Sequence, residues 1–197
     1  MNAKTAQTLD VVGATDLLRE DHRKIKELFR EFESAGYERK KALAAAIMRE
    51  IEVHTVIEEE LFYPAARRAL EDDELIVESE EAHHVAKVLL AELKVLPMGR
   101  RFVAKFQLMI NNVRQHIREE ESALFPKVER SDIDLMELGE EMGRLKMKTL
   151  QSGAVSRGMI LVDEVSHKTG VGLGALLIVG VVAGVAAALL KSSSELR

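Results

Sequence analysis

The sequence contains one short motif twice. His54-Thr-Val-Ile-Glu58-Glu-Glu-Leu-Phe-Tyr-Pro64 is matched 62 residues later by His116-Ile-Arg-Glu-Glu120-Glu-Ser-Ala-Leu-Phe-Pro126. Both copies read His-x3-Glu, with a proline ten residues after the histidine. Because residues four apart lie on one face of an α-helix, each copy directs an imidazole and a carboxylate to the same point. Imidazole and carboxylate together suit iron, and other divalent metals less selectively.

Each copy is preceded by a segment that carries its own histidine. These are His22 before the first copy and the pair His83-His84 before the second. The unit of a lone-histidine helix followed by a His-x3-Glu helix therefore occurs twice. Two such hairpins, packed face to face, would bring four histidines and two glutamates together inside a four-helix bundle, where metal sites are built from facing helices. The number of these candidate ligands predicts a dinuclear metal site.

Composition supports an all-α fold and limits the kinds of site. Aromatic residues and prolines are few, whereas alanine, leucine, glutamate and lysine are plentiful, as in helical proteins. The absence of cysteine excludes disulfides and thiolate ligands, so any metal must rest on nitrogen and oxygen. A net charge of −5 without a basic stripe argues against nucleic acid as a partner.

Apolar residues recur at spacings of three, four and seven, which predicts helices. We expect an up-down four-helix bundle with a fifth helix on its flank, and five helices over residues 15–34, 38–68, 73–96, 100–127 and 133–150. Thr15 is the expected N-cap of the first helix. Pro64 is expected to kink the second helix just past the motif, and Pro126 marks the end of the fourth helix or a kink in it.

Each candidate ligand has an ordinary structural alternative. A histidine on an apolar face, as His22 is, more often belongs to a core than to a metal site, but its register with the later motifs favours ligation. Glu58 is followed by Glu59 and Glu60, which could mark an acidic solvated face. Because only Glu58 shares the face of His54, we expect Glu59 and Glu60 to point away.

The third helix offers two adjacent histidines. His83 aligns with the apolar positions that follow it, as His22 does in the first helix, whereas His84 would place Lys87 on the inner face. The 62-residue offset of the repeat favours His84 instead, unless a loop residue has been gained or lost. We choose His83 as the predicted ligand.

The chain after the bundle contains an apolar segment. Residues 151–170 read as a linker. Residues 171–190 form a stretch of twenty residues without a polar side chain, between Lys168 and Lys191. As a helix they would span about 30 Å, the thickness of a bilayer core. We therefore predict a C-terminal transmembrane helix followed by a short tail, 191–197. The alternative is a helix buried in a soluble assembly.

Two further expectations concern this segment and the N-terminus. Gly170-x3-Gly174 and Gly180-x3-Gly184 place small residues on one face, which predicts homo-oligomers formed through the anchor. Residues 1–14 read as a flexible tail, and Met1–Gly13 lacks the apolar run of a signal peptide. The bundle, residues 15–150, is therefore expected to stay in the cytoplasm beside a single membrane pass.

The paired His-x3-Glu motifs, each followed by Leu-Phe-(Tyr)-Pro, and the Asp-His22-x2-Ile opening resemble the hemerythrin-like, or HHE cation-binding, family. The resemblance covers about residues 15–150. It implies iron as the cofactor, two ions per chain bridged by carboxylates. It also implies the ligands His22, His54, His83 and His116 as terminal groups, with Glu58 and Glu120 as bridges.

The sequence departs from the oxygen-carrying branch of that family. That branch has His-x3-His on the third helix and His-x4-Asp on the fourth, whereas this chain has Lys87, Val88 and Glu120 at the corresponding positions. One fewer imidazole leaves more open coordination, which argues against simple oxygen carriage. The resemblance implies chemistry or sensing with a small diatomic molecule or peroxide: dioxygen, hydrogen peroxide (catalase-like) or nitric oxide.

Three other functions compete with this reading. One is iron storage, delivery or sensing without catalysis. A ferritin-type ferroxidase needs Glu-x2-His on two helices, and only the third helix offers it, as Glu80-x2-His83 or Glu81-x2-His84. The third alternative is a structural, membrane-anchored bundle with incidental histidines.

Overall fold

Residues 12–152 are described by a computed structural model, and every regular element within them is helical. These described elements form five helical segments, which we call arms. Three of them are single helices: α1 (Ala14–Ser34), α4 (Glu74–Val95) and α7 (Leu135–Ser152). In the other two, a π-helical turn links two α-helices: α2 (Tyr37–Ile57), η1 (Glu58–Phe62) and α3 (Tyr63–Ala69) in one, and α5 (Arg100–Glu119), η2 (Glu120–Leu124) and α6 (Phe125–Val128) in the other. The predicted all-α bundle with a fifth helix is confirmed.

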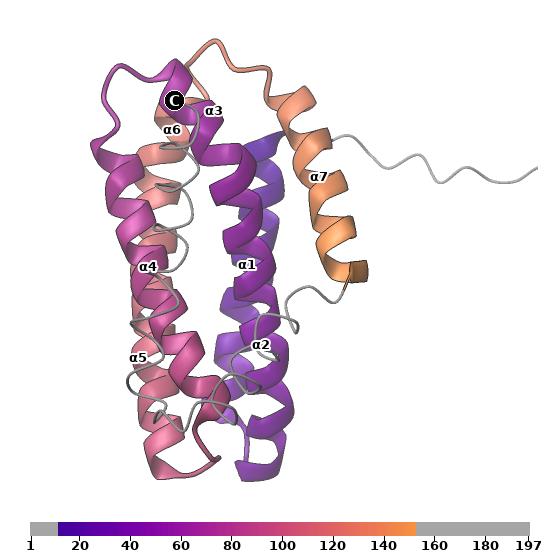
Figure 1. Cartoon of the computed structure of the whole chain (residues 1–197), viewed down its shortest axis with the longest axis vertical. Helices are drawn as coiled ribbons and strands as arrows, with labels where there is room; N and C mark the ends of the chain where they lie inside the picture. The colour runs from indigo at the N-terminus through magenta and orange to yellow at the C-terminus, as the bar shows by residue number, and fades with distance from the viewer. Residues whose placement is uncertain (1–11, 153–197) are drawn as a thin grey trace, which may run out of the picture. The chain divides into compact units, whose positions relative to one another are not determined.

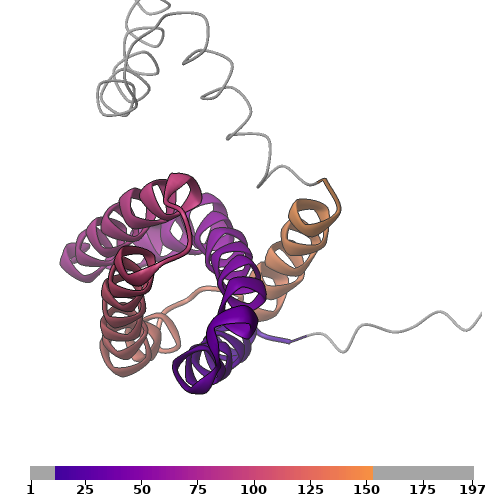
Figure 2. The ribbon, with the colours of Figure 1, turned by 90° about the horizontal axis from the view of Figure 1, so that it is seen from below.

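The first four arms pack as two hairpins (Figure 1). α1 contacts α2 along its length, and α4 likewise contacts α5. α7 packs against α1 and α2, and the view along the bundle places it outside the four-helix arrangement (Figure 2). The fifth helix therefore covers a flank of the first hairpin, as expected.

An apolar core fills the bundle at the end remote from the two prolines. The predicted inward stripes supply it: Ile25, Phe29 and Phe32 from α1 meet residues of α2, α4 and α5. Phe32 and Phe106 stack with ring centroids 4.3 Å apart. This core holds the two hairpins together at that end of the bundle.

Two helix starts differ from the sequence expectation. α1 begins at Ala14, with Gly13 rather than Thr15 at the N-cap, and Thr15 is buried within the first turn. α7 begins at Leu135 rather than at 133, because the Asp134 carboxylate accepts hydrogen bonds from the amides of Met136 and Glu137, both 3.0 Å. A side-chain cap of this kind fixes where a helix starts.

The distortion expected at each proline takes the form of a π turn just before it. The Tyr63 amide donates to the Glu58 carbonyl and the Phe125 amide to the Glu120 carbonyl, each spanning five residues instead of four. A proline lacks the amide that would continue the α-helical pattern, so a wider turn ahead of it keeps the helix going. Both motif glutamates open such a turn.

The predicted transmembrane helix, 171–190, lies outside the described residues, as do most of the predicted linker and the short tail. Within 12–152, none of the helices combines the length and the hydropathy needed to cross a bilayer.

Gly139 and Gly143 on α7 should respond in opposite ways to alanine. A Cβ at Gly139 would lie 2.1 Å from the Val12 carbonyl oxygen and 2.9 Å from the Ala14 amide nitrogen, so Gly139→Ala must push α7 away from the start of α1. We expect a loss of about 1–3 kcal/mol. At Gly143 the nearest atom is 3.9 Å away, so Gly143→Ala should gain about 0.5–1 kcal/mol from helix propensity. Urea unfolding of both variants checks this, and equal effects would contradict the close packing at Gly139.

Candidate metal centre

Six polar side chains from the two hairpins converge between the helices. The motifs supply two of them each, and α1 and α4 supply one each. None is more than 4% exposed: His22, His54, Glu58, His83, His116 and Glu120. The structure therefore brings together all six residues that the sequence nominated as ligands.

The four imidazoles form two pairs, one in each hairpin. His22 Nε2 lies 3.2 Å from His54 Nε2, and His83 Nε2 lies 3.0 Å from His116 Nε2. In both pairs the rings meet nearly edge to face. The internal repeat of the sequence thus appears as a repeat of geometry.

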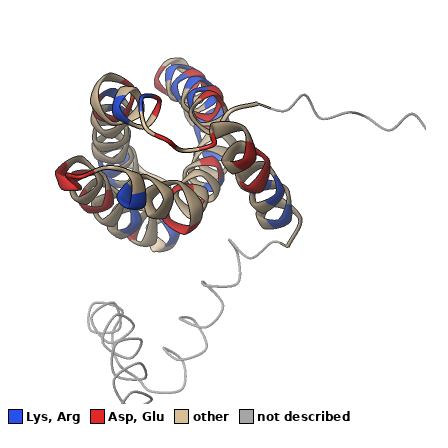
Figure 3. Ribbon diagram, turned by 90° about the horizontal axis from the view of Figure 1, so that it is seen from above, with Lys and Arg blue, Asp and Glu red and all other residues tan. Residues whose placement is uncertain are grey.

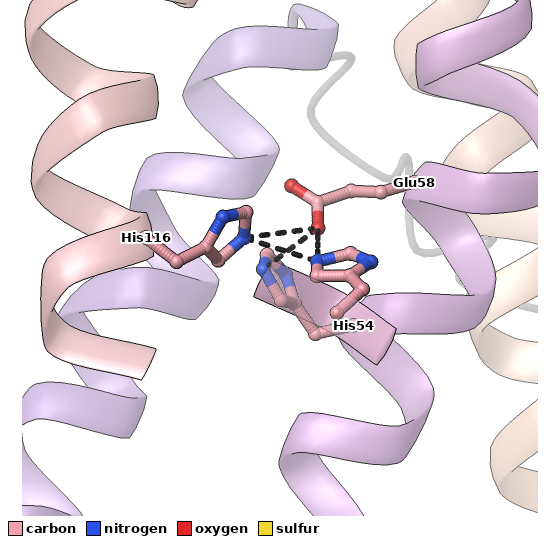
Figure 4. A group of neighbouring side chains, drawn as sticks. His54, Glu58 and His116 are labelled. Carbon is pink, nitrogen blue, oxygen red and sulfur yellow. Dashed lines mark hydrogen bonds and ion pairs between the residues drawn. The ribbon is translucent and has the colours of Figure 1, made fainter. Parts of the chain in front are cut away.

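The two glutamates lie between these pairs. Glu58 Oε2 is 3.0 Å from His54 Nε2 and 3.1 Å from His83 Nε2, so it reaches one histidine of each hairpin. Glu120 Oε2 does the same, 3.3 Å from His116 Nε2 and 3.4 Å from His22 Nε2. Figure 4 shows Glu58, His54 and His116 turned toward one another. A carboxylate in this position can bridge two cations.

The donor set contains two overlapping groups of residues that could hold a metal ion. Within each group, the ligand atoms all lie within 4.8 Å of one another. One group is His54, Glu58, His83 and His116, and the other is His22, His54, Glu58 and Glu120. Glu58 Oε1 is buried and accepts no hydrogen bond within the described residues. Buried carboxylate oxygens without a partner are costly, and a cation beside them would remove that cost. Nitrogen and oxygen donors of this kind suit iron.

Without a cation, protons supply the positive charge that the carboxylates need. Burial opposes protonation of His22 and His83 most strongly. Hydrogen bonds to Glu120 and Glu121 for His22, and to Glu58 and Glu59 for His83, outweigh it and raise the pKa of each to about 9. Burial also opposes ionisation of Glu58, but the attraction of His54 and hydrogen bonds from three histidines hold its pKa well below the usual range.

The metal-free protein should therefore lose stability as pH rises. Because the pKa of His22 and of His83 is raised from 6.5 to about 9 on folding, the stabilisation is complete below pH 6.5 and disappears as pH passes 9. The loss should be on the order of a few kcal/mol. The urea midpoint of chelator-treated protein, measured from pH 6 to 9.5, should fall across this window. A midpoint that stays level or rises would contradict protonation of His22 and His83 in the metal-free protein.

One outer carboxylate was misjudged from the sequence. Glu59, expected to point away, accepts from His83 Nδ1 at 3.2 Å and pairs with Lys87 Nζ at 2.7 Å. Glu121 is its counterpart, 3.1 Å from His22 Nδ1 and 3.0 Å from Lys26 Nζ. A carboxylate on Nδ1 fixes the tautomer, so that Nε2 is presented to the site. Glu60 is exposed, as expected.

Tyr63 is the residue beside the six ligands whose direction the sequence left unassigned. Its buried hydroxyl donates to Glu120 Oε1 at 2.9 Å and lies 3.3 Å from His83 Nε2. Burial and the charges of Glu120 and Glu58 raise its pKa well above 10, so it remains a neutral donor. The matching position of the second motif is Phe125, which stacks on His22, so the site has a phenol on one side only.

The structure places His83 inside the cluster and leaves the neighbouring His84 exposed. His83→Ala should remove one ion per chain, because it deletes one imidazole of one pair, whereas His84→Ala should leave the metal content unchanged. Elemental analysis of both variants beside the parent protein checks this. Equal metal content in the two variants would count against His83 as a ligand.

Three comparisons bear on this site. The family model of the hemerythrin HHE cation binding domain matches residues 13–128. The crystal structure of a hemerythrin HHE cation binding domain-containing protein from Mycobacterium kansasii aligns with a TM-score of 0.60 and 28% identity, over 71% of this chain and 91% of that one. A DNA nickase from Nostoc sp. is 30% identical over an alignment of 118 residues, which covers 57% of this chain and 32% of the nickase. The chain thus spans about a third of that relative's length.

Proposed function

Since the chain belongs to the hemerythrin HHE cation binding domain family, we propose that its bundle holds two iron ions and uses them to bind, sense or turn over dioxygen, peroxide or nitric oxide. The observation that carries the proposal is the burial of four imidazoles and two carboxylates around one centre, with each glutamate reaching both hairpins. His22, His54, His83 and His116 would be the terminal ligands. Glu58 and Glu120 would bridge.

The side chains around this centre suit a small ligand. Bound iron would supply Lewis-acid and redox chemistry. The Tyr63 hydroxyl, beside Glu120 and His83, can hold a hydrogen bond or a proton at the centre. Phe62 and Phe125 pack edge to face next to His22, with ring centroids 5.5 Å apart, and both are fully buried, so they keep bulk water away on that side.

Peroxide consumption tests the catalytic form of this proposal. Iron-loaded full-length protein should consume hydrogen peroxide steadily, and Tyr63→Phe, which keeps the ring and removes the hydroxyl, should slow it while the iron content stays the same. Phe125→Tyr is the matched control, since it adds a hydroxyl at the corresponding position of the repeat. No turnover of peroxide, with no spectral response to dioxygen or nitric oxide, would contradict the proposal.

Iron binding without catalysis is the second candidate. It is favoured by the closed surroundings of the six ligands, which leave them at most 4% exposed, as a store or an occupancy sensor would require. The same peroxide assay separates the two functions. Stoichiometric iron with no turnover of peroxide, and with no spectral response to dioxygen or nitric oxide, would support storage, delivery or sensing of iron.

We further propose that residues 171–190 anchor the protein in a membrane by a single pass, with the bundle in the cytoplasm and with oligomers formed through the Gly-x3-Gly faces. Membrane fractionation of the full chain against a chain ending at 170 tests the anchor. Nicking of DNA is not carried over from the Nostoc protein, because the aligned part is only 32% of it.

A further inference from the structure

A groove of about 360 Å³ lies between α1 and α5, outside the metal centre. Five of its six lining residues are cationic, although the chain as a whole is acidic. They come from both helices: Arg23, Lys26, Arg30, Arg114, Arg118 and the buried Ile117. Seen from above, Lys and Arg are mixed with Asp and Glu on the helices (Figure 3). The groove was not visible as a basic stripe in the sequence because two helices far apart in the chain form it.

Two of these cations pair with a carboxylate on another helix. Arg114 forms two hydrogen bonds to Glu33, 2.7 and 2.8 Å, and Lys26 pairs with Glu121 at 3.0 Å. Both interactions are repeated on the other side of the bundle. Lys87 pairs with Glu59 there, and Glu52 with Lys94, which is the Arg114 pair with its charges exchanged. Lys26 and Arg114 are therefore accounted for by the architecture.

The other three cations, Arg23, Arg30 and Arg118, are not accounted for in this way. Arg30 reaches Glu27 only at 3.9 Å, too far for a hydrogen bond, and Arg118 is bonded to the neutral Gln115. Arg23 pairs with the exposed Glu20 one turn earlier on its own helix. These arginines keep most of their donors for another acceptor.

The internal repeat provides a comparison within one molecule. Aligned on the ligand histidines, Arg23, Arg30 and Arg118 correspond to His84, Ala91 and Val56 on the opposite side. The folding and metal-binding parts of the repeat match in pairs, but these three positions do not. The arginines are therefore an addition to one side of the bundle, and the repeated architecture does not explain them.

We propose that the α1/α5 groove is a binding site for a phosphate group. Guanidinium groups from two facing helices can hold the several oxygens of a phosphate through charge-assisted hydrogen bonds, and the fork of each arginine matches that geometry. Arg30 and Arg118 supply the main contacts from opposite walls, and Arg23 and Lys26 add positive charge. The phosphate belongs either to a small soluble anion or to a lipid headgroup, since both present the same oxygens.

Calorimetric titration of the full-length protein with inorganic phosphate tests the site. Arg30→Ala and Arg118→Ala should each weaken binding about tenfold or more, the usual cost of a hydrogen bond to a charged group, and the double variant should abolish it. Arg144→Ala is the matched control. Arg144 is an exposed helical arginine on α7 with one carboxylate partner, Glu140 at 3.5 Å, and its loss should leave affinity unchanged. Measuring chelator-treated protein as well separates this site from phosphate bound to iron.

A second arm identifies the source of the phosphate. Co-sedimentation with phosphatidylcholine vesicles, with and without phosphatidic acid, compares the parent protein with Arg30→Ala, so that any contribution of residues 153–197 is the same in both. Arginine-dependent binding of free phosphate supports a soluble ligand. Arginine-dependent binding of phosphatidic acid alone supports a lipid. If neither depends on Arg30 and Arg118, or if Arg144→Ala weakens binding equally, the proposal is overturned.

Discussion

Replacement of Glu58 by glutamine should leave the purified protein almost without metal. Glu58 belongs to both groups of ligand atoms, 3.0 Å from His54 in the first hairpin and 3.1 Å from His83 in the second. Glutamine keeps the shape but offers no anionic oxygen to share between two cations. Residues that only orient a ligand contribute about 10–100-fold to metal affinity, so loss of a shared ligand should cost more than about 100-fold.

The control for this variant lies two residues away on the same π turn. Glu60 is exposed, so Glu60→Gln removes the same charge from the same turn without touching the site. Metal content measured by elemental analysis should fall in Glu58→Gln and stay at the parent value in Glu60→Gln. Because glutamine also relieves a buried negative charge, Glu58→Gln should still fold, which circular dichroism checks. Full metal content in Glu58→Gln would show that Glu58 is not a bridge.

Removal of the metal should lower the thermal stability of the bundle by a large amount. Ions that bind only the folded state stabilise it by about 4 kcal/mol per site when free metal is a thousand times the dissociation constant. In a domain of this size, each kcal/mol shifts Tm by about 2–4 °C, so two sites should give roughly 15–30 °C. The four histidines and two glutamates of the centre come from both hairpins, so the ions also join the hairpins to each other.

Calorimetry of one preparation before chelation, after chelation and after iron is restored measures this shift. The restored sample should return to the first Tm, which separates loss of metal from damage by the chelator. His84→Ala should show the same shift as the parent protein, because its side chain lies outside the centre. An unchanged Tm after the metal has been removed would contradict a metal pair at the centre of the bundle.

The fold and the six inward side chains could be predicted because both follow from periodicity. Histidine and glutamate four apart on a helix must share a face, and the twofold repeat places two such faces opposite each other. The same argument separated His83 from His84, since only His83 continues the apolar stripe of α4, and the structure buries His83 alone. The 62-residue offset between the two His-x3-Glu motifs pointed to His84. The offset from His22 on α1 to His83 on α4 is one residue shorter.

The residues that sequence reasoning missed depend on the π turns. An ideal α-helix would turn Glu59 away from His83 and leave the direction of Tyr63 undefined. The wider turn at Glu58–Phe62 brings Glu59 to within 3.2 Å of His83 Nδ1, while the Tyr63 hydroxyl reaches Glu120. The available signal was the proline six residues after each motif glutamate, because a residue without an amide proton favours such a turn ahead of it.

The metal content of freshly purified full-length protein, with its optical spectrum, tests the central claim most directly. Two histidine pairs and two shared carboxylates predict two iron ions per chain, with absorption bands of an iron pair that disappear on chelation. Less than one transition-metal ion per chain, in protein that stays unloaded when iron is supplied, would contradict it. The four buried histidines would then be structural.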